Sequence, residues 1–233
     1  MFDSSLALPV HPALRPSEYT AALIQVLRDR AAWVSGANVL EVGSGSGVVL
    51  AALGALGART LCGIDIENDA VDSGTRLLHG LGHTDNAELH RGDMWQPVAQ
   101  RRFDLIVANL PHFPMEPAEL GGRLPSWSAG GHDGRGRLDP FLSGLPAHLA
   151  PGARAVITHN AFVDVGRSRA LLEAEGLTLR IVATRLVYIA ADKLQRMARD
   201  VLANEEGRSI FRYGPYAFGE LHIVEIGAAG VLG

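Results

Sequence analysis

The chain has 233 residues, of which 47% are hydrophobic and 20% are charged, and its formal net charge is −4. This length suits one α/β domain with a buried core, and the composition is that of an ordinary globular protein. A protein that holds naked nucleic acid by its phosphates usually carries a basic surplus, and none is present. The composition therefore disfavours a nucleic acid as acceptor or ligand, although a local basic patch is compatible with this net charge.

Few residues indicate the cellular compartment or a metal site. Cys62 is the single cysteine, so neither an internal disulfide nor a thiolate metal cluster is expected, and a reducing compartment fits. His79 and His83 have helical spacing but no third ligand. The first residues lack the pattern of a signal peptide, and the longest weakly polar run, Val48–Ala58, is too short to cross a bilayer. We therefore expect a cytoplasmic protein with no membrane and no metal partner.

In chain order, the predicted elements begin with a proline-containing arm over residues 1–16 and a helix from Glu18 to Trp33. Strands and helices then alternate. The predicted strands are Asn38–Val42, Thr60–Ile64, Ala87–His90, Phe103–Ala108 and Ala153–Thr158, and the predicted helices are Val48–Leu56, Asp69–Leu81, Asp139–Leu149 and Asp164–Glu175. This alternation, with continuous apolar strands, predicts the α/β class and a doubly wound, mostly parallel sheet covered on both faces.

The last part of the chain has a different pattern. Leu177–Ile189 and Glu220–Ile226 resemble two long strands, and Ala190–Glu206 between them is helix-like. Lys193, Arg196 and Arg199 have helical spacing there, but acidic neighbours dilute their charge, so we interpret them as a solvated helix face rather than a site for an acidic substrate. The predicted organisation is an N-terminal arm and helix over residues 1–35 and one domain over 36–233, with an insert at about 190–215.

The motif Val39–Gly47 (VLEVGSGSG) runs from a strand through a glycine turn into a helix. Its glycines allow a tight turn and a close approach of the backbone to a ligand. Asp65 ends the next strand, where a carboxylate can accept the hydroxyls of a ribose. Glu41 stands two positions before the first glycine. A carboxylate there would repel the pyrophosphate of a dinucleotide but suits the cationic amine of S-adenosylmethionine, which we therefore favour over a dinucleotide or a purely structural turn.

Three segments resemble motifs of the class I S-adenosylmethionine-dependent methyltransferases: Val39–Gly47 the first, Gly63–Ile66 the second and Arg91–Met94 the third. The resemblance implies the Rossmann-like methyltransferase fold, with seven strands and an antiparallel C-terminal strand. It also implies S-adenosylmethionine as cofactor, with S-adenosylhomocysteine as product. The cofactor-binding residues that we predict are Glu41, Gly43, Ser44, Gly45, Gly47, Asp65, Ile66, Asp93, Met94 and Asn109.

Asn109-Leu110-Pro111-His112 directly follows the strand Phe103–Ala108 and resembles the (N/D)-P-P-(Y/F) loop of methyltransferases that act on planar nitrogens. The lone pair of such a nitrogen is delocalised, so it is a poor nucleophile. An Asn side-chain oxygen and the next carbonyl can accept hydrogen bonds from its N–H groups, which orients it and offsets developing positive charge. We therefore predict these four residues as catalytic.

His112 stands where the related motifs have an aromatic residue and leaves two functions open. If its ring stacks on the acceptor, the enzyme methylates a planar amide or amine nitrogen, of a protein glutamine or a nucleobase. If it is a general base, the chain is a small-molecule N- or O-methyltransferase of secondary metabolism. A third reading, a non-catalytic module that binds the nucleoside, is disfavoured by the intact Asn109 and Pro111.

Further segments resemble the HemK-type protein-glutamine N5-methyltransferases, namely Arg15–Thr20, Gly130–Gly134 with Phe141-Leu142, and His148–Ala153. A loop of 25 residues at 113–137 follows the catalytic motif, and we predict it to be a substrate flap. The predicted acceptor-binding residues are Tyr19, His112, Phe113 and Trp127. About 35 residues precede the first strand, so we expect no counterpart of the family's N-terminal helical domain, which argues against a release factor as the acceptor.

Overall fold

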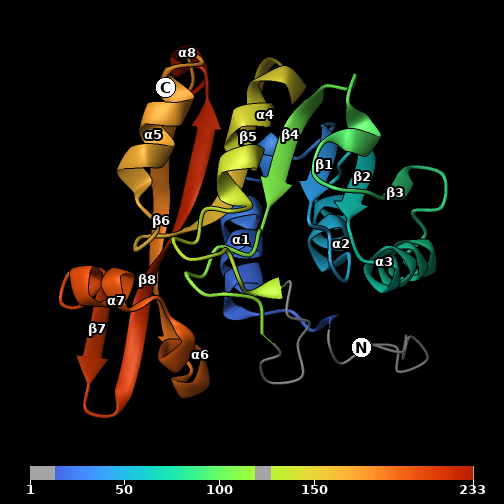
Figure 1. The fold of residues 1–233 in the computed structure, drawn as a ribbon. Helices are drawn as coiled ribbons and strands as arrows, with labels where there is room; N and C mark the ends of the chain where they lie inside the picture. Colours follow the sequence, from blue (N-terminus) through green and yellow to red (C-terminus); the bar gives the residue numbers. More distant parts are fainter. Residues whose placement is uncertain (1–13, 119–126, 233) are drawn as a thin grey trace.

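The computed structural model describes residues 14–118 and 127–232 (Figure 1). The helices are α1 (Glu18–Asp29), α2 (Val48–Ala55), α3 (Asn68–Gly80), α4 (Leu138–His148), α5 (Val165–Glu173), α6 (Ala191–Arg196), α7 (Arg199–Glu205) and α8 (Ala229–Leu232), with short 3-10 turns η3 (Ala31–Trp33) and η4 (Gln96–Val98). The strands are β1 (Asn38–Val42), β2 (Thr60–Asp65), β3 (Ala87–Arg91), β4 (Phe103–Ala108), β5 (Leu149–Asn160), β6 (Thr178–Ile189), β7 (Ile210–Tyr213) and β8 (Tyr216–Gly227).

One sheet joins all these strands in the order β3-β2-β1-β4-β5-β8-β6, and β7 pairs with β8. Strands β1 to β5 are parallel to their neighbours, whereas β8 runs antiparallel to β5, β6 and β7. The predicted fold class, a doubly wound and mostly parallel sheet with an antiparallel C-terminal strand, is therefore confirmed. Strand order reverses between β1 and β4, and the carboxyl ends of strands at such a point form a crevice for ligands.

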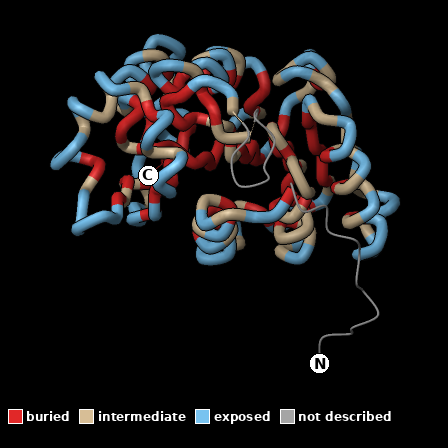
Figure 2. Tube along the Cα trace, turned by 60° about the horizontal axis from the view of Figure 1, so that its bottom comes forward, coloured by how far each residue is buried: buried red, intermediate tan, exposed pale blue. Residues whose placement is uncertain are grey.

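The apolar runs of the central strands are explained by burial on both faces. In β1, Leu40 packs into one core with residues of α4 and α5, and Val39 packs into a second core with α1, α2 and α3. In β4, Ile106 and Leu105 divide between the same two cores, because successive strand residues point to opposite faces. Figure 2 shows the buried residues gathered inside the molecule, with exposed segments around them.

Two predicted helices differ from the structure. The helix expected to reach Trp33 ends at Asp29, and the turn η3 follows, which brings the Trp33 ring under the guanidinium of Arg154 at 4.5 Å. The helix-like insert is divided into α6 and α7 by Met197, whose backbone is extended and whose side chain is buried. Met197 joins the core, so the chain leaves the helical path there.

The insert also contains an eighth strand, which the sequence analysis missed. β7 is only four residues long and pairs with β8 from Ile210 to Tyr213. So short a segment has no clear periodicity, and only its partner strand determines it.

The two described arms of the predicted flap at 113–137 pair with each other. Isolated bridges join Phe113 to Ala129 and Met115 to Gly131, and Phe113, Met115 and Ala129 pack into the main core. The part of the flap at residues 119–126 lies outside the described residues. Of the helices that the structure describes, none has both the length and the apolar character needed to cross a membrane.

Candidate active site

A cavity of about 420 Å³ lies at the carboxyl ends of β1, β2 and β4, where strand order reverses. This volume is in the range of small-molecule and cofactor sites. Its wall includes nearly all the predicted site residues: Tyr19, Glu41, Gly43, Ser44, Gly45, Asp65, Ile66, Asp93, Met94, Asn109, Leu110, Pro111, His112, Phe113 and Trp127. Segments far apart in the sequence thus meet in one site.

The glycine turn between β1 and α2 has the backbone conformation that its sequence suggested. Gly43 and Gly45 have φ of +74° and +51°, a region that favours glycine. Asp65 holds the turn, because its Oδ2 accepts the N–H of Gly45 at 2.8 Å. Gly47 is not among the residues of the cavity wall. A Cβ there would lie 2.8 Å from the Cα of Gly74, so Gly47 allows α2 to pack closely against α3, and its contact with the cofactor stays a prediction.

Glu41 is 2% exposed, and its Oε2 has no hydrogen-bond partner among the described residues. Burial, and then the charge of Asp65, raise the pKa of its carboxyl well above the usual value. The Ser44 hydroxyl, also on the cavity wall, is buried and likewise without a partner in the described part of the chain. An unpaired buried carboxylate is costly, so this pair is arranged to receive a donor or a cation. The residues therefore fit the amine end of S-adenosylmethionine.

The predicted adenine side is more open. Met94 has φ of +52°, a left-handed conformation that is uncommon for a residue with a side chain. Asp93 is exposed and lies 3.7 Å from the guanidinium of Arg137, a residue of the cavity wall that the sequence analysis did not identify. Ile66 lies exposed at the cavity edge. The roles of Asp93, Met94 and Ile66 toward the adenine stay predictions.

Asn109 is held by two threonines from distant parts of the chain. Its Oδ1 accepts the hydroxyl of Thr158 at 2.9 Å, and its Nδ2 donates to Thr20 at 3.3 Å. An amide oxygen has two acceptor positions, so Oδ1 can still accept from an acceptor N–H.

His112 is 2% exposed, and its Nδ1 lies 2.5 Å from the carbonyl of Leu110. A neutral imidazole must donate in that contact. Burial lowers the pKa of His112 to about 4, so the ring is neutral near pH 7. Its Nε2 has no partner among the described residues. The Leu110 carbonyl, predicted to orient the acceptor, thus already accepts one hydrogen bond and has one position left. Stacking of His112 on an acceptor stays a prediction.

The site also contains residues that the sequence did not reveal. Asn160, at the end of β5, accepts the hydroxyl of Tyr19 at 2.8 Å and lines the cavity. The ring of Tyr19 meets His112 edge-on with centroids 6.0 Å apart. No local pattern marks Asn160, although the end of a parallel strand is a general signal for a site.

Lys193 of α6 corrects the interpretation of that helix. It is half-buried, and its Nζ lies 4.4 Å from the ring centroid of Phe113, on the cavity wall. Arg196 and Arg199 are exposed, so the expected solvated helix face holds for these two residues but not for Lys193.

Phe113 and Trp127, the two residues expected from the flap, lie in different surroundings. Phe113 is buried and packs edge-on against Phe162. Trp127 lies against the glycine turn, since a Cβ on Gly45 would come within 3.5 Å of its ring. Trp127 thus lies beside the cofactor turn on the cavity wall, and its contact with the acceptor stays a prediction.

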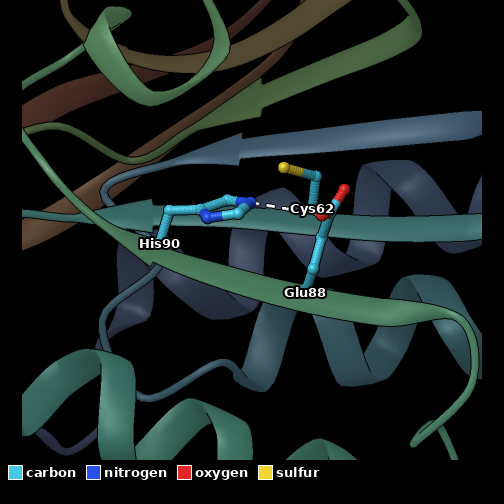
Figure 3. Close-up of side chains that lie close together, drawn as sticks. All are labelled: Cys62, Glu88 and His90. Carbon is cyan, nitrogen blue, oxygen red and sulfur yellow. Dashed lines mark hydrogen bonds and ion pairs between the residues drawn. The ribbon is translucent and has the colours of Figure 1, made fainter.

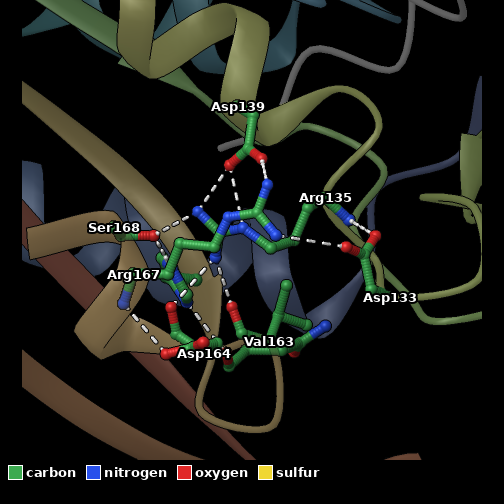
Figure 4. A network of polar contacts seen from close by, with 9 residues as sticks. Asp133, Arg135, Asp139, Val163, Asp164, Arg167 and Ser168 are labelled. Carbon is green, nitrogen blue, oxygen red and sulfur yellow. Dashed lines mark hydrogen bonds and ion pairs between the residues drawn. The ribbon is translucent and has the colours of Figure 1, made fainter. Parts of the chain in front are cut away.

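A buried arginine supports this end of the sheet (Figure 4). Arg135 donates to Asp139, to Ser168 and to the carbonyls of Val163 and Asp164. Ser168 in turn contacts Nε2 of His159 at 2.8 Å, next to Asn160 in β5. The loop before α4 is therefore fastened to α5 and to the strand end that supplies Asn160.

Cys62, Glu88 and His90 lie close enough together to suggest a metal site (Figure 3). However, Glu88 forms an ion pair with Arg101 at 2.5 Å, and the same guanidinium lies 3.7 Å from the Cys62 sulfur. Burial raises the pKa of the Cys62 thiol to about 12, so the thiolate that a metal requires is disfavoured. We interpret the group as an ion-pair cluster.

Comparison with known proteins finds methyltransferases. A family model described as a methyltransferase domain matches residues 39–121. The release factor glutamine methyltransferase of Gloeobacter violaceus is 29% identical over 157 residues, covering 63% of this chain and 54% of that protein. The protein of the same name from Xylella fastidiosa is 32% identical over 190 residues, covering 78% and 66%. The ribosomal protein uL3 glutamine methyltransferase of Bradyrhizobium diazoefficiens is 30% identical over 143 residues, covering 58% and 43%. The chain thus spans at most about two thirds of these relatives.

Solved structures resemble it along nearly its whole length. The Mtq2–Trm112 complex of E. cuniculi, described as responsible for methylation of the translation termination factor eRF1, matches with a TM-score of 0.61 at 17% identity, covering 92% of this chain and 98% of that chain. The ribosomal protein L11 methylase of Lactobacillus delbrueckii subsp. bulgaricus matches with a TM-score of 0.55 at 18% identity, covering 91% and 82%. At these identities the likeness concerns the fold alone.

Proposed function

Because the chain belongs to the HemK group of class I S-adenosylmethionine-dependent methyltransferases, we propose that it methylates the side-chain amide nitrogen of a glutamine in a protein. The observation that carries the proposal is the placement of Asn109. Its amide, oriented by Thr158 and Thr20, lies on the same cavity wall as the glycine turn and Glu41. Relatives named as glutamine methyltransferases of a release factor and of ribosomal protein uL3 support an amide acceptor.

When bound, S-adenosylmethionine supplies a methyl group on a sulfonium centre that is ready for displacement. An amide nitrogen attacks poorly because its lone pair is delocalised, so positioning must contribute much of the rate. Oδ1 of Asn109 and the remaining position on the Leu110 carbonyl accept the two N–H groups of the acceptor. Both oxygens also stabilise the positive charge that develops on nitrogen, until the methylated nitrogen releases one of its two protons to solvent.

The competing function, with His112 as a general base for a hydroxyl acceptor, is not favoured. A base is most effective when its pKa lies near the working pH, and burial lowers the pKa of His112 to about 4. One ring nitrogen already contacts the Leu110 carbonyl. The other is enclosed, with no partner among the described residues.

The proposed partners are S-adenosylmethionine and a protein acceptor, in the cytoplasm, where protein-synthesis factors occur. Two protein acceptors are proposed, a release factor and a ribosomal protein. Each is named as the substrate of a relative that this chain covers only in part. The proposed product is an N-methylated glutamine.

The test uses the purified chain with radiolabelled S-adenosylmethionine. Purified release factor, ribosomal protein uL3 and a lysate separated into protein, RNA and small-molecule fractions serve as acceptors. We expect label in protein, on a glutamine residue when the product is sequenced by mass spectrometry. Label confined to RNA or to small molecules would contradict the proposal.

Asn109→Ala tests the mechanism. Turnover should fall roughly 100- to 1,000-fold, the usual effect of removing one preorganised group from the transition state. Affinity for S-adenosylmethionine, measured by calorimetry, should change little. Asn204→Ala, at an exposed position of α7, is the matched control and should behave as wild type. Near-normal turnover of the Asn109 variant would refute the assigned role.

A further inference from the structure

An exposed aromatic face lies on the part of the sheet formed by β6, β8 and β7. We define it by Tyr188, Tyr213, Tyr216 and Phe218. Tyr188 pairs with Phe218 in the register of β6 and β8, and Tyr213 pairs with Tyr216 in that of β7 and β8. Paired residues share one face of a sheet, so these four rings lie on the same side. Figure 1 shows β7 and the start of β8 as a hairpin at one edge of the molecule.

The rings form a continuous surface. Tyr188 contacts Phe218 and Tyr216 with centroids 5.8 and 6.3 Å apart, and Tyr213 contacts Phe218 at 6.0 Å. Cross-strand aromatic pairs help to stabilise a hairpin, which is the plainest explanation for them. However, Tyr188, Tyr213 and Tyr216 are still 50%, 60% and 57% exposed. Contiguous exposed apolar surface is uncommon unless something binds there.

Folding alone does not account for this face, because the hairpin already has a buried side. Ile189, Ile210 and Ala217 point to the opposite face and belong to the main core, together with Met197 of the insert. The hairpin is thus anchored from one side, and the aromatic face on the other side is left to solvent.

The aromatic face meets the active-site cavity at Tyr188. Tyr188 lines that cavity and belongs to the aromatic face, whereas Val187 and Ile189, which also line the cavity, point to the opposite face of the strand. A polypeptide that reached Asn109 past Tyr188 would lie next to the rings in contact with Tyr188, those of Phe218 and Tyr216.

We propose that the aromatic face binds the segment of the acceptor protein that adjoins the methylated glutamine, an extended segment with apolar side chains. The inference rests on the proposed function, since it requires a polypeptide acceptor. Tyrosine rings supply a large contact area at low entropic cost, and their hydroxyls can bond to a peptide backbone. A second copy of the chain is a poorer occupant, because a dimer through this face would cover the cavity wall at Tyr188 and obstruct the acceptor.

The test compares a protein acceptor with a small amide. The double variant Tyr213→Ser/Tyr216→Ser alters two of the three rings of the face that do not line the cavity. The probes are purified release factor, or whichever polypeptide the wild-type chain labels, and N-acetylglutamine methylamide, which has no flanking segment. We expect KM for the protein to rise about tenfold or more, as for loss of interface tyrosines. kcat, turnover of the small amide and affinity for S-adenosylmethionine should be unchanged.

Two controls complete the design. Tyr213→Phe/Tyr216→Phe keeps the rings and should keep a KM near wild type. Leu81→Ser removes an exposed apolar residue after α3 and should have no effect. Melting temperatures show whether the variants fold.

Each outcome decides between the possible occupants. A Ser/Ser variant that is folded and has a wild-type KM for the protein overturns the inference. So does a wild-type dimer that this variant converts to monomer without a change in KM, because the face would then bind a second copy. If the wild-type chain labels no polypeptide, the proposed function fails as well, whereas protein labelling with unchanged KM refutes the aromatic face alone.

Discussion

Replacing Glu41 by Gln should stabilise the empty protein at higher pH while it weakens cofactor binding. In the folded chain, burial and the nearby Asp65 raise the pKa of Glu41, and a hydrogen bond from the Leu50 backbone offsets this only in part. The folded state therefore keeps the proton to a higher pH than the unfolded state. Between these two pKa values the wild type loses about 1.4 kcal/mol of stability per pH unit from this group.

The amide of the Glu41→Gln variant carries no such proton, so its free energy of unfolding should fall less steeply as the pH rises. The pKa of Asp65 is also raised by burial, which gives a slope of the same sign, but Asp65 is present in both proteins. The variant therefore gains in free energy of unfolding relative to the wild type as the pH rises from the pKa of an ordinary Glu to the raised pKa of Glu41.

Cofactor binding should change in the opposite direction. A hydrogen bond to a charged group contributes about 1.5–3 kcal/mol, so the dissociation constant for S-adenosylmethionine should rise roughly 10- to 150-fold. Wild-type affinity should also increase with pH, because Glu41 must give up its proton to hold a cationic amine, and the variant should lack this dependence.

Urea unfolding on both sides of neutral pH measures the first effect. Calorimetry in buffers of different ionisation enthalpy measures affinity and the protons released. A variant that is less stable than wild type at every pH, or that binds the cofactor equally well, would refute the role derived for Glu41.

Two other substitutions test the support of the site. Arg135→Met leaves the carbonyls of Val163 and Asp164 without their donor, while Asp139 keeps its ion pair with Arg167, so unfolding should become easier by about 2–5 kcal/mol, with a melting temperature lower by roughly 4–20 °C in calorimetry. A drop of a degree or less would show that the network adds little. Thr158→Val removes the donor to Asn109, and a loss of about 1 kcal/mol corresponds to roughly fivefold lower kcat with unchanged cofactor affinity. Unaltered kcat in steady-state assays would mean that Asn109 is oriented without Thr158.

The fold was largely predictable because its signals are local. Strands buried on both faces need continuous apolar runs, and β1 and β4 have them. The glycine turn and Asp65 were visible for the same reason, since positive φ at Gly43 and Gly45 requires a residue without a side chain. β7 was missed, because only pairing with β8 makes a strand of so few residues.

The sequence by itself determined the order of the elements, the cofactor turn and the motif that begins at Asn109, because each depends on neighbours a few residues away. Only the tertiary structure decided how these groups are set for chemistry. The threonines that orient Asn109 come from α1 and β5, 89 and 49 residues away in sequence. The neutral state of His112 follows from burial, and Lys193 reaches the cavity because α6 starts directly after the end of β6, which lines it. Long-range packing and desolvation leave no local pattern, so no motif could have shown them.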